Sequence, residues 1–237
     1  MHDRLQLLLS APRSVAENLA IDEAMTRAAA AERRTVLRLW WGGAPTVVLG
    51  RSERPEQVVD LAACRRLGVE IVQRPTGGGT VLQTDGVLNY SLTCPAPPML
   101  DIRATFSVGA RLLVGALDRL GVAAEARGIS DVAVGDRKIS GNAIAKRWGG
   151  LLLHGTLLLD LDLELVESCL RHPPREPNYR RGRGHRDFLT TLRALGLTTT
   201  RSELEAAVLA VAGRMAAEGA FRTLLIRRPG RHSGEDT

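Results

Sequence analysis

The sequence predicts an α+β fold in which helices flank a mixed β-sheet. Short apolar runs of strand length and longer amphipathic stretches of helix length are interspersed along the chain. Apolar residues make up 44% of the 237 residues, which is enough for one sizeable core, and aromatic residues only 3%. We therefore expect one domain over residues 1–226, with a core of mainly Leu, Val and Ala, and a disordered tail over residues 227–237.

The first predicted elements are a strand and a long helix. Residues 5–9 form an apolar run, and Ser14 followed by Glu17 is the pattern of a capping box. The helix should continue to Ala31. Four of its side chains are expected to be buried: Leu19, Ile21, Ala24 and Met25.

A hairpin and a second helix are expected next. Residues 36–41 and 46–49 are strand-like, and a Gly42-Gly43 turn between them is typical of a β-hairpin. Residues 55–67 predict a helix that carries Cys64 on its apolar side, where packing is the expected role of the thiol.

The rest of the chain continues in the same manner. Strands are predicted at residues 69–73, 87–93, 122–126, 135–143, 151–159 and 221–226. Helices are predicted at residues 106–120, 187–195 and 202–218, the last with Ser202 as its cap and Leu204, Val208, Val211 and Met215 facing inward. Helical spacing also places four side chains on one apolar stripe: Leu163, Val166, Cys169 and Leu170.

Charge and cysteine content narrow the class of protein. A net charge of +6 and a pI near 10 favour an anionic substrate or an acidic partner. Basic residues are not interleaved with aromatic ones, which argues against a nucleic-acid platform. The three cysteines form neither a disulfide framework nor a metal-ligand spacing, as in a reducing cytoplasm. No apolar run approaches the roughly 20 residues of a membrane-spanning helix, so no membrane association is expected.

A glycine-rich turn is the first candidate for a binding site. Arg74 is followed by the three glycines Gly77 to Gly79, between two apolar strand-like runs. Glycines without side chains allow a ligand to approach the backbone, and free N–H groups beside an arginine suit a phosphate or a carboxylate. A flexible hairpin loop explains the same residues, so the turn alone leaves both interpretations open.

Two polar residues in later strands are further candidates. His154 stands between leucine runs, and taken alone it is best explained as a core histidine that a backbone carbonyl satisfies. Lys138 is one of two lysines in a chain whose other basic side chains are mostly arginine. A site that needs a compact, mobile ammonium would use lysine there, whereas Arg137 beside it is consistent with an ordinary surface position.

Four segments in order resemble the lipoate–protein ligase family, which is related to biotin–protein ligases and octanoyltransferases. Residues 18–23 are similar to its first-helix signature, and residues 74–81 to its Arg-x-x-Gly-Gly-Gly-x-Val loop. Residues 136–143 resemble its lysine motif, and residues 154–158 the strand that follows. The resemblance spans most of the chain and implies the catalytic-domain fold of biotin and lipoate ligases.

The resemblance implies a two-step, ATP-dependent reaction. Lipoate or octanoate is activated as an acyl-adenylate, and the acyl group then passes to a lysine of a lipoyl carrier protein. Lys138 is the implied catalytic residue, and Asp131 is a candidate ligand of Mg²⁺. The positions implied to bind ATP or the lipoyl-adenylate are Arg74, Thr76, Gly77, Gly78, Gly79, Thr80, Val81, Leu82, Gln83, Lys138, Ser140, Gly141, Asn142, Ala143, His154, Gly155 and Thr156.

The chain departs from the family pattern at three places. Gln83-Thr84 replaces a His-Asp pair that is common in the ligases, and Ser130 replaces the asparagine before Asp131. We expect no C-terminal accessory domain after the catalytic region, in which case the enzyme acts alone or with a separate accessory protein. The carrier is a dehydrogenase lipoyl domain, a glycine-cleavage H-type protein or another small lipoyl protein. The basic segment from Tyr179 to Arg186 is a solvated loop, covers the nucleotide phosphates or, as we hypothesise, helps to dock that carrier.

Two other functions are open on the sequence. An octanoyltransferase would carry the acyl group on a cysteine, for which Cys169 is the candidate, although it also fits the apolar helix stripe. A non-catalytic module would bind lipoate, an acyl-adenylate or the carrier, and the presence of Lys138 argues against it.

Overall fold

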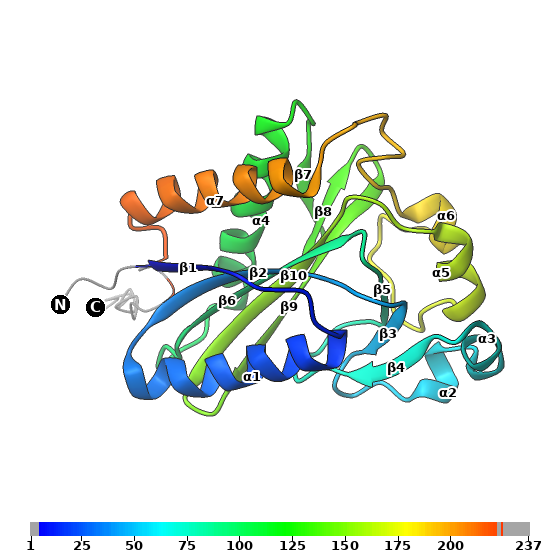
Figure 1. Ribbon diagram of the computed structural model, residues 1–237, viewed down its shortest axis with the longest axis horizontal. Helices are drawn as coiled ribbons and strands as arrows, with labels where there is room; N and C mark the ends of the chain where they lie inside the picture. Colours follow the sequence, from blue (N-terminus) through cyan, green and yellow to red (C-terminus); the bar gives the residue numbers. More distant parts are fainter. Residues whose placement is uncertain (1–4, 222–223, 225–237) are drawn as a thin grey trace, which may run out of the picture.

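The computed structural model describes residues 5–221 and 224, and their elements form two sheets with helices around them (Figure 1). The larger sheet has seven strands in the order β1-β2-β6-β10-β9-β8-β7. Its pairs are antiparallel except for β1 and β2, which are parallel. The strands are β1 (Leu5–Leu9), β2 (Thr35–Trp41), β6 (Val87–Pro95), β7 (Glu125–Arg127), β8 (Asp131–Val134), β9 (Arg137–Arg147) and β10 (Gly150–Leu158).

The smaller sheet has three strands in the order β4-β3-β5. They are β3 (Thr46–Leu49), β4 (Glu70–Gln73) and β5 (Val81–Gln83). The predicted hairpin is therefore wrong, because β2 belongs to the large sheet and β3 to the small one. Gly42 lies where the chain crosses between them: its N–H donates to the Val87 carbonyl at 3.1 Å, and a Cβ would come within 2.1 Å of the Thr84 carbonyl oxygen.

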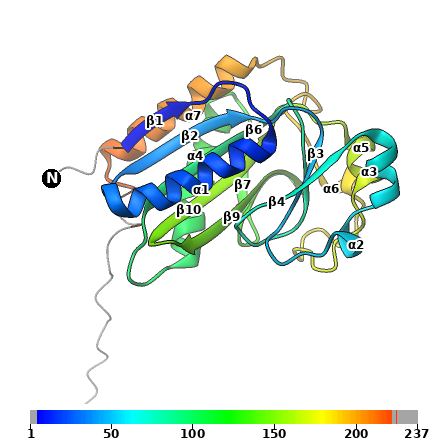
Figure 2. The same cartoon turned by 60° about the horizontal axis from the view of Figure 1, so that its bottom comes forward.

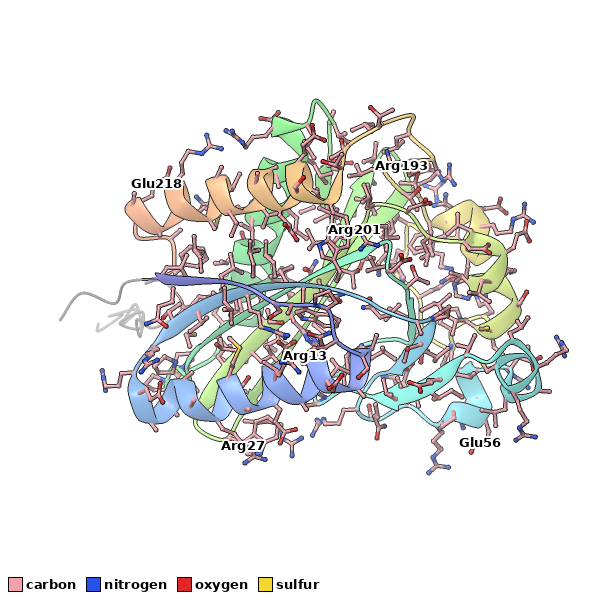
Figure 3. All side chains as sticks on the ribbon, in the orientation of Figure 1. Arg13, Arg27, Glu56, Arg193, Arg201 and Glu218 are labelled. Atoms are coloured by element: carbon pink, nitrogen blue, oxygen red, sulfur yellow. The ribbon has the colours of Figure 1, made fainter. Side chains whose placement is uncertain are left out.

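Helices cover both faces of the large sheet (Figures 1 and 2), so the predicted α+β class is confirmed. On one face α1 (Val15–Glu32) packs against β6 and β10, and on the other α4 (Ile102–Arg119) packs with α7 (Arg201–Ala217) behind it. Four short helices gather beside the small sheet: α2 (Pro55–Val58), α3 (Leu61–Leu67), α5 (Leu163–Cys169) and α6 (His185–Phe188). Charged side chains such as Arg27 on α1 and Glu56 on α2 lie on the outer surface (Figure 3).

The buried face of α1 differs from the prediction. The capping box at Ser14 is present and Leu19 is buried, as predicted. The other three side chains expected in the core are half-buried or exposed: Ile21, Ala24 and Met25. Polar side chains are buried in their place: Asn18, Asp22 and Thr26. This polar face exists because the guanidinium of Arg38, on the neighbouring β2, lies against it.

Two predicted helices are shorter than expected. The segment over residues 55–67 is broken at Asp60, whose side chain accepts the N–H of Ala63 at 2.8 Å and begins α3, with Cys64 buried as predicted. The segment over residues 187–195 is helical only in α6. The N–H of Thr190 instead donates to the Lys138 carbonyl at 2.9 Å, which ties this part of the chain to β9.

The remaining boundaries shift by a few residues. Asp101 accepts the N–H of Ala104 at 2.9 Å, so α4 begins at Ile102 rather than at residue 106. The strand predicted at 122–126 is β7, at 125–127. Thr200, not Ser202, caps α7. The inward-facing residues of that helix are buried as predicted: Leu204, Val208, Val211 and Met215.

The chain end is only partly described. Phe221 and Leu224 lie in a turn and a 3₁₀ segment, not in the strand predicted at 221–226, and the other residues of that strand and the tail at 227–237 lie outside the described residues. Within the described ranges, no helix is long and apolar enough to cross a lipid bilayer.

Candidate active site

A cavity of about 710 Å³ lies between the glycine-rich turn, the strands β9 and β10, and the segment that precedes α6. All the predicted site residues line it except Thr76 and Gly77. Those on its wall are Arg74, Gly78, Gly79, Thr80, Val81, Leu82, Gln83, Asp131, Lys138, Ser140, Gly141, Asn142, Ala143, His154, Gly155 and Thr156. Two sheets and several loops thus bring together residues that are as far apart in the chain as positions 74 and 156.

Lys138 is held in this wall by an ion pair. Its Nζ lies 2.8 Å from Oδ1 of Asp131, and the hydroxyl of Tyr179 donates to Oδ2 of the same carboxylate at 2.9 Å. The Lys138 side chain keeps 24% of its surface exposed, whereas that of Asp131 keeps 8%. The pair therefore fixes the ammonium at the cavity surface and leaves part of it open to a ligand.

Gly141 leaves room for the lysine. A Cβ at this position would lie 2.7 Å from Lys138 Nζ and 2.8 Å from its Cε. The end of a lysine side chain is flexible and can move aside, so we expect the fold to tolerate a methyl group there while the ammonium shifts.

Gly141→Ala should therefore lower the turnover of the reaction proposed below by about 10–100-fold, because a misplaced catalytic group loses rate steeply. The measurement is kcat together with the thermal midpoint Tm. Gly213→Ala on α7, where a Cβ has open space, is the matched control: it should leave kcat unchanged and raise Tm slightly, because alanine is the better helix former. Full activity of Gly141→Ala would show that the position of Lys138 does not limit the rate.

Arg74 holds the glycine-rich turn in shape. Its guanidinium donates to the carbonyls of Gly77 and Gly79, at 2.7 and 2.8 Å, and to Oγ1 of Thr76 at 2.9 Å. A further bond of 3.3 Å reaches the Val48 carbonyl. Burial lowers the pKa of Arg74 to about 10, so it stays charged at neutral pH. We had expected this cation beside the nucleotide, but its donors bind the turn itself.

The turn needs glycine for two different reasons. Gly78 has φ of +90°, a conformation that favours glycine, and a Cβ would come within 3.0 Å of Arg74. A Cβ added to Gly77 or to Gly79 would meet no atom of the described residues within 4 Å. At Gly79 this open space belongs to the cavity, so its backbone is accessible to a ligand.

His154 joins the turn to the buried face of α1. Its Nε2 lies 2.7 Å from Oγ1 of Thr76, so a side chain of the turn satisfies it, not the backbone carbonyl that we expected. Its Nδ1 is 3.8 Å from Oδ2 of Asp22, and burial lowers the pKa of His154, which keeps the ring neutral. Asp22 accepts Ser91 Oγ at 2.5 Å and Arg38 Nη1 at 2.7 Å. This network fixes the turn relative to the sheet.

Two amide groups are fixed beside the lysine motif. Asn142 accepts the hydroxyl of Tyr90 at 2.6 Å and donates to the Ser130 carbonyl at 2.6 Å. Gly155 makes this possible, since a Cβ would lie 2.1 Å from Oδ1 of Asn142. On the β5 side, Gln83 exchanges two hydrogen bonds with Asn89, of 2.7 and 3.0 Å.

The surroundings of Asp131 do not fit a magnesium ion held by the protein. Both carboxylate oxygens already have partners, a lysine and a tyrosine. Within the described residues, no group of three or more His, Cys, Asp or Glu side chains is suited to a metal ion. The Mg²⁺ assignment of Asp131 remains a prediction from the resemblance, and we derive no step from it.

Cys169 lies in the core, not in the cavity wall. Its exposed fraction is 0%, and burial raises the pKa of its thiol. The thiol of Cys64, whose pKa burial raises to about 12, lies 4.0 Å from the Cys169 carbonyl. Neither cysteine lines the cavity, so packing explains both.

Several residues of the cavity wall were not predicted as individual site residues. Tyr179 and Asn89 contact the predicted residues directly, and Arg180 and Phe188 lie on the wall near them. The only sequence signal for this side of the cavity was the basic segment from Tyr179 to Arg186, which was predicted to cover the nucleotide phosphates or to dock the carrier. The partners are separated by tens of residues, so only the fold brings them together.

The protein-family model described as the lipoyl protein ligase A/B catalytic domain matches residues 14–212 of the chain. The lipoate-protein ligase A subunit 1 of Thermoplasma acidophilum is 32% identical over 183 residues, which cover 73% of this chain and 69% of that protein.

Solved structures agree with this match. The structure of a lipoate-protein ligase A bound with ATP is similar with a TM-score of 0.77 and 26% identity, over 94% of each chain. A bipartite lipoate protein ligase from T. acidophilum, solved as part of a lipoylation system with its E2 lipoyl domain, shares the fold. Its TM-score is 0.79 at 24% identity, over 96% of this chain and 99% of that one. This chain therefore belongs to the lipoyl protein ligase A/B catalytic domain family.

Proposed function

We propose that the protein is an ATP-dependent lipoate–protein ligase whose reacting groups meet in the cavity beside Lys138. The observation that carries this proposal is the position of two features on one cavity wall: the ammonium of Lys138, held by Asp131, and the open backbone of the turn at Gly79. A fixed cation and preorganised N–H donors are what a reaction needs when negative charge shifts between oxygen atoms. The ligase names of its relatives support the same reaction.

In the first step the carboxylate oxygen of the acyl substrate attacks the α-phosphorus of ATP. A bond forms between this oxygen and phosphorus, the bond from phosphorus to the bridging oxygen breaks, and pyrophosphate leaves with the bond's electrons. Lys138 stabilises the negative charge on the α-phosphate, and the free N–H groups of the turn bind its oxygens. Asp131 and Tyr179 keep the ammonium in place.

In the second step a lysine amine of the carrier attacks the acyl carbonyl of the adenylate. An amide bond forms, AMP leaves with the electrons of the broken acyl–oxygen bond, and the attacking amine loses a proton. Negative charge now develops on the carbonyl oxygen, close to the same ammonium. One fixed cation therefore serves both steps, which is the role that we assign to Lys138.

The apolar part of the cavity fits the acyl chain. Its wall includes Leu19, Trp40, Val48, Leu82, Leu158 and Val166. Lipoate and octanoate each present an apolar chain that ends in one carboxylate, and a slot of this kind holds the chain while the carboxylate reaches the polar wall.

The protein partner is a lipoyl carrier. The T. acidophilum structure belongs to a lipoylation system described as a bipartite ligase and its E2 lipoyl domain, and a relative from that organism is named subunit 1. By analogy we propose a lipoyl domain as the acceptor here and a separate accessory subunit as a partner. A dehydrogenase lipoyl domain is the first carrier to test, and a glycine-cleavage H-type protein the second.

The test is to incubate the purified protein with ATP, lipoate or octanoate, and a lipoyl domain. Mass spectrometry should show the acylated domain, and AMP should form in equal amount. If the lipoyl domain is instead acylated from an acyl carrier without ATP, the protein is an octanoyltransferase and not a ligase. Binding of lipoate without AMP formation, with or without an added accessory subunit, would leave only a binding module.

Cys169→Ser separates the ligase from a cysteine-dependent transferase. Because the thiol is buried away from the cavity, we expect carrier lipoylation by this variant to stay within about twofold of the wild type. Cys64→Ser, a buried thiol next to it, controls for the cost of a polar group in this part of the core. Complete loss of acyl transfer in Cys169→Ser alone, with the protein folded, would contradict the ligase mechanism.

A further inference from the structure

The basic segment after residue 178 is folded against the cavity and does not form a free docking loop. Tyr179 donates to Asp131, the partner of Lys138, at 2.9 Å. Arg183 donates to the side chain and the carbonyl of Asp136, at 3.0 and 2.8 Å. Both contacts tie the segment to the β8–β9 hairpin. Our docking hypothesis for this segment concerns Arg180, Arg181 and Arg183, and only Arg181 of these is exposed. The burial of Arg180 and the bonds of Arg183 argue against a docking role for these two.

Arg180 is the unusual residue of this segment. Only 4% of it is exposed, yet it lies on the cavity wall. Its Nε donates to the Arg183 carbonyl at 2.8 Å and lies 3.6 Å from Oε2 of Glu176, and its guanidinium packs over the ring of Phe188 at 4.9 Å. These contacts hold the guanidinium in one position.

One donor of that guanidinium is left over. Nη2 of Arg180 is buried and has no hydrogen-bond partner within residues 5–221 and 224. A buried donor without an acceptor costs free energy, more so when it is charged, and such a group persists where a ligand supplies the acceptor. Two other cations of the wall that lie near the turn and the lysine motif are already engaged, Arg74 by the turn and Lys138 by Asp131.

We infer that Nη2 of Arg180 binds a phosphate oxygen of the nucleotide. This inference rests on the proposed function, since it assigns a ligand to the same cavity. The ligand chemistry is an oxyanion, and the planar guanidinium with its fixed N–H donors suits phosphate. The carboxylate of lipoate is the other possible oxyanion. The nucleotide is favoured because it brings several phosphate groups to a wall that also carries Arg127, Arg171 and Arg175.

The experiment compares the dissociation constants of ATP, AMP, adenosine and lipoate for the wild type, Arg180→Gln and Arg181→Gln. We expect Arg180→Gln to weaken ATP and AMP by about tenfold or more, as expected for a lost charged hydrogen bond, and to leave adenosine and lipoate within about twofold. Arg181→Gln removes the same charge from the adjacent exposed residue and should change none of them. Arg180→Lys, which keeps the charge and can keep the packing, should recover part of the affinity.

Three outcomes would overturn this inference and leave the proposed function intact. These are wild-type affinity for ATP and AMP in folded Arg180→Gln, a loss of adenosine affinity as large as that of AMP, and a loss confined to lipoate. The second would give Arg180 a structural role, and the third would show that Arg180 binds the carboxylate of lipoate. If Arg180→Gln does not fold, Arg180→Lys decides by the same ratio of AMP to adenosine affinity. A wild-type protein that binds neither ATP nor AMP would overturn the proposed function as well.

Discussion

Lys138→Ala should abolish most of the ligase activity, with a fall in kcat of about 10²–10³-fold. The reason is that one fixed positive charge stabilises the transition states of both steps, and removal of such a group has effects of this size. Single-turnover lipoylation of the carrier, and separately the transfer from pre-formed lipoyl-adenylate, measure the two steps. Both should fall. Lys138→Arg should recover little, because a guanidinium is larger and planar and does not replace a compact ammonium.

Lys146→Ala is the matched control, since it changes the other lysine of the chain. Lys146 Nζ donates to the Pro98 carbonyl at 2.8 Å at an exposed position, and it does not line the cavity. The Lys146→Ala protein should have the activity of the wild type in both half-reactions. Wild-type rates for Lys138→Ala in both half-reactions would remove the mechanism proposed for this residue.

Arg38→Met should destabilise the protein by about 3–5 kcal/mol, a large share of the ~5–15 kcal/mol of a typical domain. Arg38 and Asp22 are both 0% exposed and 2.7 Å apart, and the guanidinium also binds Ser10 Oγ at 2.6 Å and the Asn18 carbonyl at 3.1 Å. Methionine fills the space but leaves the charge of Asp22 buried without its partner. The free energy of unfolding in urea measures the loss.

Two comparisons separate the buried charge from lost packing. Arg111→Met breaks the exposed pair with Glu218, near the outer end of α7 (Figure 3), and should cost less than ~1 kcal/mol. The double variant Arg38→Met, Asp22→Leu should recover part of the stability, because no uncompensated charge remains. A cost for Arg38→Met as small as that for Arg111→Met would contradict the importance of this network for the fold.

The sequence was most informative where one segment carries the whole signal. The capping box at Ser14 and the apolar stripe of α7 are local patterns, and each indicates its structure without knowledge of the rest. The run of glycines after Arg74 is also local and predicted a turn, although it left the role of that turn open. Lys138 was informative for the same reason, as one of only two lysines among many arginines. These patterns were enough to identify the fold class, whereas most of the cavity wall was predicted from the resemblance to the ligase family.

The prediction was wrong where partners are distant in the chain. Strand periodicity does not say whether β2 and β3 pair with each other or join different sheets, so the hairpin was wrong. The polar face of α1 could not be interpreted without Arg38, which is 16 residues from Asp22. Likewise, Tyr179 reaches Asp131 across 48 positions, so its contact with the partner of Lys138 had no local signal.

The central claim is that this cavity forms an acyl-adenylate before any carrier is present. Exchange of labelled pyrophosphate into ATP measures that step directly. We predict exchange that requires lipoate or octanoate, needs no carrier, persists in Cys169→Ser and is lost in Lys138→Ala. Folded wild-type protein that acylates a lipoyl domain while showing no such exchange would contradict the account.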